Sequence, residues 1–111
     1  MKKFIVLYLS PVSATEQMAK ATPEQAKAGM DAWMAWAGKA GGAIVDLGAP
    51  LGGGRHVESG SNGDGRTQVR GYSILQGAST DEILRVLDGH PHLMMPGASI
   101  EVLEAFQMPG V

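Results

Sequence analysis

Short stretches with alternating side-chain positions predict four β-strands. In the stretch 2–10, KKFIVLYLS, the even positions from 4 to 8 share one face and the odd positions from 5 to 9 share the other. Both sets are apolar, so this strand should be covered on both faces. The other three strands are predicted at 43–50 (AIVDLGAP), 67–76 (TQVRGYSILQ) and 98–105 (ASIEVLEA).

A long helix is predicted over 21–42. Thr22 stands at the N-cap with Pro23 at the first helical position, and the helix closes on Gly41 and Gly42. Gly29 costs about 1 kcal/mol relative to alanine in a helix, and we expect it to mark close backbone packing. A stripe of apolar residues is expected to lie on the sheet: Ala26, Met30, Trp33, Met34 and Ala37.

A second helix is predicted over 79–89. Ser79 and Glu82 have the spacing of a capping box, and Gly89 ends the helix. The elements then follow the order βαββαβ in one domain, 1–111, with a glycine-rich hairpin excursion at 51–66.

The order βαββαβ predicts an α+β fold, a ferredoxin-like plait with an antiparallel four-stranded sheet and both helices on one face. The other face of the sheet is then bare, although the first strand is apolar on that side too. Two sheets that associate face to face would cover it. The sequence therefore predicts a homodimer.

Composition and charge exclude several classes of partner. Hydrophobic residues make up 44% of the 111 residues, enough for a core, and the formal net charge is −2 with scattered basic residues, so we expect no nucleic-acid and no membrane partner. The apolar run 4–9 is too short for a signal peptide or a membrane span, and the chain has no cysteine. These features favour a cytoplasmic protein. The segment GGGR at 52–55 lacks the Gly-Lys-Ser/Thr ending of a phosphate loop, and no cofactor is expected.

Two of the three histidines, His90 and His92, flank Pro91 directly after the second helix. An imidazole carries protons near neutral pH, and Asp46 could orient His90 as a general acid or base. Alternatively, Gly89 and Pro91 only stop the helix, and the histidines are exposed or bind carbonyl groups at the helix end. A metal shared by both histidines would need a third ligand, for which Asp46 and Glu101 are the candidates.

Strand parity places four polar residues on the sheet face that a dimer would cover: Asp46, Arg70, Tyr72 and Glu101. There they would line a cavity, with Arg70 paired to Asp46 or Glu101. The alternative is an interfacial salt bridge that only fixes the register of the dimer.

Several segments together resemble the YCII-related proteins, also called the DGPF group. They are MKKFIVLYLSP, MDAWMAW, GGAIVDLGAPLG, RGYSILQGAS and HPHLMMPGASIEV. The resemblance implies a dimeric α/β barrel and a histidine and aspartate pair in a cleft, matched here by His90 in Gly89–His92 and by Asp46. The segment GDGRT keeps Asp64 and Gly65 of the DGPF motif, with arginine and threonine in place of its proline and phenylalanine.

The expected function is the binding of a small organic metabolite by a homodimer. Acid-base chemistry of the isomerase or lactone type would use His90 and Asp46, with Arg70, Tyr72, His92 and Glu101 as ligand contacts. The alternative is a non-catalytic ligand-binding or accessory module, and the sequence leaves open whether the protein is an enzyme.

Overall fold

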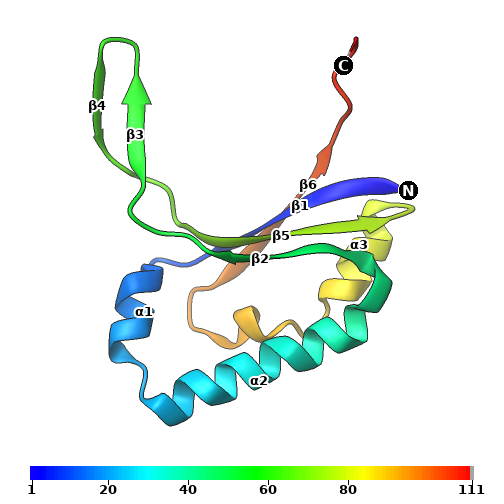
Figure 1. The fold of residues 1–111 in the computed structure, drawn as a ribbon, viewed down its shortest axis with the longest axis horizontal. Helices are drawn as coiled ribbons and strands as arrows, with labels where there is room; N and C mark the ends of the chain where they lie inside the picture. Colours follow the sequence, from blue (N-terminus) through cyan, green and yellow to red (C-terminus); the bar gives the residue numbers. More distant parts are fainter. Residues whose placement is uncertain (111) are drawn as a thin grey trace.

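The computed structural model describes residues 1–110. Its centre is a four-stranded antiparallel sheet in the order β2-β5-β1-β6, and Figure 1 shows the helices on one side of it. This α+β arrangement is compatible with the predicted ferredoxin-like plait. The strands of the sheet are β1 (Lys2–Leu9), β2 (Ile44–Pro50), β5 (Val69–Gly77) and β6 (Ser99–Ala105). The helices are α1 (Ala14–Lys20), α2 (Pro23–Ala40) and α3 (Thr80–Leu87), with 3₁₀ turns η1 (Gly41–Ala43) and η2 (Pro91–Met94).

The core lies between the sheet and the helices. In β1 and β5, buried positions alternate with half-buried ones, as period-two strands with one covered face require. The buried apolar side chains come from both layers: Phe4, Val6, Tyr8, Trp36, Leu75, Ile83 and Leu87. The opposite face of the sheet carries no helix (Figure 1), which agrees with the predicted bare face.

Helix α2 begins and ends where its sequence signals place it. Thr22 and Gln25 form a reciprocal capping box, and the N–H of Gly41 closes the last turn on the carbonyl of Ala37. With 18 residues it is the longest helix in the described chain, yet no helix of residues 1–110 is both long and apolar enough to cross a membrane.

The predicted apolar stripe of α2 is only half right. Trp33 and Ala37 pack on the core, but Met30 and Met34 are 62% and 54% exposed, and Ala26 is exposed as well. At 1.5 Å per residue, 18 residues span about 27 Å. The helix therefore extends past the core at its N-terminal end, which leaves Ala26 and Met30 exposed, whereas Met34 lies beside Trp33 on the exposed side of the packed half.

Gly29 lies in the exposed N-terminal part of α2. A Cβ built on Gly29 meets no heavy atom within 4 Å, so close backbone packing does not explain this glycine. Replacing it by alanine removes backbone freedom from the unfolded chain without a clash. We expect Gly29→Ala to raise the free energy of unfolding by about 0.5–1 kcal/mol, measured by urea denaturation. A loss of stability would show that the helix needs glycine here.

Helix α1 and the two strands of a hairpin, β3 (Arg55–Glu58) and β4 (Ser61–Asp64), are present in addition to the predicted four strands and two helices. Helix α1 is short and begins at Ser13, whose side chain accepts the N–H of Glu16. Within the glycine-rich excursion, β3 pairs with β4 in a separate two-stranded ribbon. Figure 1 shows this ribbon rising from the sheet on the side away from the helices.

Candidate functional site

His90 lies at the centre of an aromatic cluster on the helix side of the sheet. Its side chain is 0% exposed at the start of η2. The imidazole stacks on Tyr8 with centroids 5.0 Å apart, and it meets Trp33 and Trp36 edge to face at 4.5 and 4.4 Å. These three rings enclose the imidazole, so His90 is a core residue and not a group at the mouth of a cleft.

The hydrogen bonds of His90 fix its tautomer. Its Nδ1 accepts the backbone N–H of His92 at 3.0 Å, so the proton of the neutral ring sits on Nε2. Within residues 1–110, Nε2 is buried and has no hydrogen-bond partner. Burial, and secondarily the nearby His92, lower the pKa of His90 to about 4. At neutral pH the ring is therefore an uncharged donor, and neither nitrogen offers a free lone pair for a general base.

His92 ties η2 to two strands of the sheet. Its Nε2 donates to the carbonyl oxygens of Leu9 at 2.9 Å and Ser99 at 3.1 Å. These carbonyls lie at the end of β1 and the start of β6. His92 thus binds carbonyl groups, as the structural alternative supposed, although they belong to strands and not to the helix end. Its role as a ligand contact has no support in this geometry.

Asp46 lies on the other face of the sheet. It is paired with Ile74 of β5, and residues directly opposite in an antiparallel pair point to the same side. Oδ1 accepts the N–H of Gly48 at 2.8 Å, and Oδ2 lies 3.5 Å from the hydroxyl of Tyr72. The structure therefore does not bring Asp46 to His90: the sheet separates them, and the expected dyad is not formed.

Arg70 and Glu101 lie apart from the Asp46–Tyr72 pair. Glu101 is exposed on β6, opposite Leu7 of β1. None of the ion pairs among the described residues joins Arg70 to Asp46 or Glu101. The expected pairing of Arg70 is not formed within one chain, because its guanidinium binds backbone carbonyls at the end of the sheet.

The described residues contain no cluster of three or more histidine, aspartate or glutamate side chains that could hold a metal ion. One nitrogen of each ring is engaged in the protein, since Nδ1 of His90 accepts a backbone N–H and Nε2 of His92 donates to carbonyls. The short spacing of His90 and His92 allows the hydrogen bond from the backbone N–H of His92 to the ring of His90.

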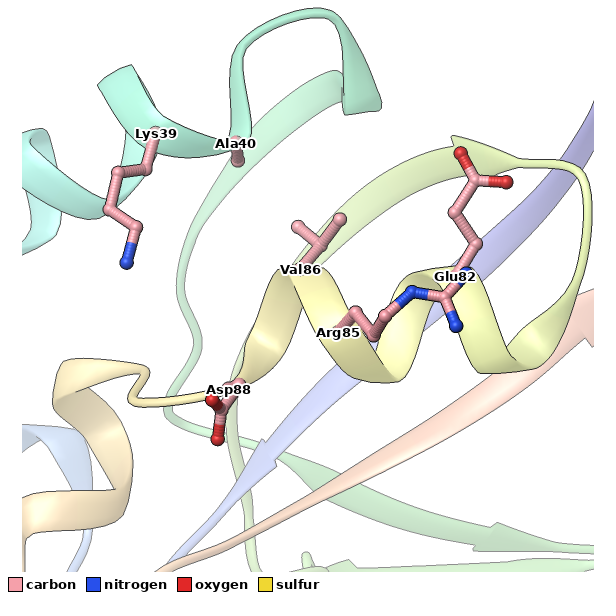
Figure 2. A pocket seen from close by; sticks show the side chains of 6 residues that line it. All are labelled: Lys39, Ala40, Glu82, Arg85, Val86 and Asp88. Atoms are coloured by element: carbon pink, nitrogen blue, oxygen red, sulfur yellow. The ribbon is translucent and has the colours of Figure 1, made fainter.

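A shallow depression of about 330 Å³ lies between the end of α2 and α3. Figure 2 shows Lys39, Arg85 and Asp88 at its rim with charged ends that do not converge on one point. The carboxylate of Glu82 already accepts the N–H of Ala78 at 2.9 Å. The lining has two basic and two acidic side chains, so the depression carries no net charge that would favour one class of ligand.

A second cleft, of about 290 Å³, lies at the foot of the β3–β4 ribbon. It borders the start of α1, the loop after β2 and the beginning of β5, and it contains Arg70. Sequence reasoning selected Arg70 but missed its neighbours, because Ser13, Thr15 and Thr67 carry no motif.

Comparison with the known protein families finds no family model that matches the sequence, and comparison with curated proteins finds no match either. The resemblance to the YCII-related proteins therefore stays a prediction from the segments quoted above.

Proposed function

We propose that the protein is a homodimer joined through the open face of its sheet, in the manner of a dimeric α/β barrel, and that the dimer binds a small organic molecule between the sheets. The observation that carries this proposal is the composition of the open face. It presents Ile5, Leu7 and Leu9 from the central strand β1, and Leu103 of β6 is 48% exposed. A monomer leaves this apolar surface in water.

The sheet face alone is too small for a stable dimer interface, so residues outside the sheet would have to contribute to it. Four strands about 4.8 Å apart and about eight residues long at 3.3 Å each cover about 500 Å². A stable interface buries about 800 Å² on each partner, so the sheet alone falls short. Figure 1 shows the β3–β4 ribbon and the segment after β6 rising on the same side as the open face. Both present exposed apolar residues, Val57 at 75% and Phe106 at 81%, that would supply the remainder.

The polar side chains of the open face define the ligand site in this proposal. Once a second copy covers them, Glu101 needs a hydrogen-bond partner, because unsatisfied buried polar groups are costly. Within the described chain, Asp46 and Tyr72 have only a long contact of 3.5 Å with each other, beside the bond that Asp46 accepts from Gly48. An apolar cavity with a few convergent polar groups is typical of small-molecule sites. Ligand binding is favoured over acid-base catalysis because His90 is enclosed on the other side of the sheet.

The dimer is tested by Leu7→Glu. This change places a carboxylate in the middle of the open face, directly opposite Glu101. We expect the dimer to dissociate at least about 100-fold more readily, because an unpaired charge is costly to bury. Sedimentation equilibrium of the 11.6 kDa chain measures the change.

Leu84→Glu is the matched control, because Leu84 is 52% exposed on α3, away from the open face. It should leave the dimer intact. A monomeric wild type, or dissociation by both substitutions, would contradict the proposal. Native mass spectrometry of the wild-type dimer would show any small molecule that it retains.

A further inference from the structure

The cleft at the foot of the β3–β4 ribbon contains a cation without an acidic partner. Among residues 1–110, Arg70 is the only charged one that lines it. Its Nε donates to the carbonyl of Ser10 at 2.8 Å, and its two terminal nitrogens donate to the carbonyls of Thr67 at 3.3 Å and Pro11 at 3.4 Å. A guanidinium has five N–H groups, so these three bonds leave two without an acceptor in the described chain.

The carbonyl contacts fix the position of Arg70 without neutralising it. Arg70 is half-buried near the start of β5, and no carboxylate of residues 1–110 lies within 4.0 Å of its nitrogens. A charge that is partly removed from water gains most from an opposite charge at the same place. The arrangement is therefore complementary to an anion.

Three hydroxyl groups line the same cleft, on Ser13, Thr15 and Thr67. Ser13 Oγ accepts the N–H of Glu16, and Thr67 Oγ1 accepts the N–H of Val69. A hydroxyl that accepts one bond still has its own proton to donate. The cleft thus combines a guanidinium with hydroxyl donors, which is the donor set that carboxylate and phosphate groups bind.

The cleft also has room for an organic group. Its volume of about 290 Å³ is at the lower end of the range for small-molecule sites, which begins near 300 Å³. Leu51 and Val69 supply an apolar wall. The tight root of the ribbon closes one side, where the N–H of Gly65 binds the carbonyl of Gly54 at 2.9 Å.

We propose that this cleft binds the carboxylate or phosphate group of a small organic anion, with Arg70 as the residue that selects the charge. This site goes beyond the proposed function because it lies within one chain and does not require the dimer.

Amide shifts of isotope-labelled full-length protein test the site with inorganic phosphate and acetate as probes, and sodium chloride at equal ionic strength as the blank. The amides of 52–54, 65 and 67 should shift and saturate with phosphate, acetate or both, and the two titrations distinguish the anion classes. Arg70→Gln should weaken that binding at least about tenfold, since it removes a charged hydrogen bond. Arg66→Gln removes an exposed arginine of the same segment that does not line the cleft, so it should change nothing.

Gly52→Leu is a second variant that tests the same site if the Arg70→Gln protein does not fold. A Cβ at Gly52 meets only Thr15 Oγ1, at 3.8 Å, so a leucine fits the backbone and fills the cleft. It should abolish the shifts while the rest of the spectrum stays folded. Absence of shifts with both probes, or their persistence in either variant, would overturn the inference. A monomer that binds phosphate would contradict only the dimer, and a dimer without shifts would contradict only the anion site.

Discussion

Acidification from pH 7 to pH 5 is expected to lower the free energy of unfolding by about 2 kcal/mol through His90 alone. The imidazole is 0% exposed, and burial together with His92 lowers its pKa from 6.5 to about 4. Between these two pH values the imidazole of His90 is protonated in the unfolded chain but not in the folded chain. Each pKa unit is worth about 1.4 kcal/mol, so the full loss is about 3.5 kcal/mol, reached as the pH falls below 4.

The direction of this effect follows from the proton balance. Above pH 6.5 His90 is neutral in both states, and its contribution to stability is fully present. As the pH falls towards 4, the unfolded state is increasingly favoured, because burial disfavours the charged ring and its second proton would sit on Nδ1, which faces the backbone N–H of His92. Below pH 4 the ring is charged in both states, and no further loss comes from this residue.

Urea denaturation at pH 7 and pH 5, at one protein concentration, measures the effect. His90→Asn keeps an acceptor for the N–H of His92 but does not titrate, so its stability should fall by about 2 kcal/mol less than that of the wild type between the two pH values. Parallel pH profiles for wild type and His90→Asn would contradict the buried neutral histidine.

The fold could be predicted where its signals are local. Thr22, Pro23 and Gly41 mark the ends of α2 through their own backbone preferences, and the structure places both ends as expected. The order of strands and helices then limits the topology. Helix α1 escaped prediction because its seven residues lie between two prolines and show no periodic apolar stripe.

The site could be predicted only in part, because side-chain direction depends on tertiary structure. Parity correctly placed Asp46 and Tyr72 on one face, since period two holds within a strand. Periodicity shows which residues of α2 share a face but not where the helix leaves the core, so Met30 was misplaced. His90 follows the end of a helix, and the direction of its side chain is set by the backbone of η2 and by the aromatic rings that it packs against.

The irregular backbone of β2 explains why Asp46 is needed at its position. Pairing with β5 shifts register between Asp46 and Ala49, and Gly48 within this irregularity has φ +85°. The carboxylate of Asp46 accepts the N–H of Gly48 and holds the turned backbone in place. The irregularity also presents the carbonyl of Leu47 to the core, where Ser73 Oγ donates to it at 2.6 Å. Tyr8 donates in turn to Ser73 at 2.8 Å, so one backbone feature connects the open face with the core.

Gly48→Ala is expected to lower the free energy of unfolding by about 4 kcal/mol or more, a large share of the 5–15 kcal/mol typical of a domain. A Cβ at Gly48 would lie 1.7 Å from the carbonyl oxygen of Tyr72, which is backbone and cannot swing aside. The positive φ adds strain for any residue with a Cβ. Strand β2 must therefore move away from β5 at this point, which breaks the contact of Ser73 with Leu47 and displaces Asp46 from Tyr72.

Gly29→Ala is the matched control for Gly48→Ala, because the chemical change is the same and the added methyl group meets no atom within 4 Å. Under identical urea denaturation the two variants should move in opposite directions from the wild type, Gly29→Ala upwards and Gly48→Ala steeply downwards. Equal stabilities would mean that β2 tolerates a regular register. In that case Asp46 would no longer be required to hold the backbone, and its carboxylate would be free to serve a ligand alone.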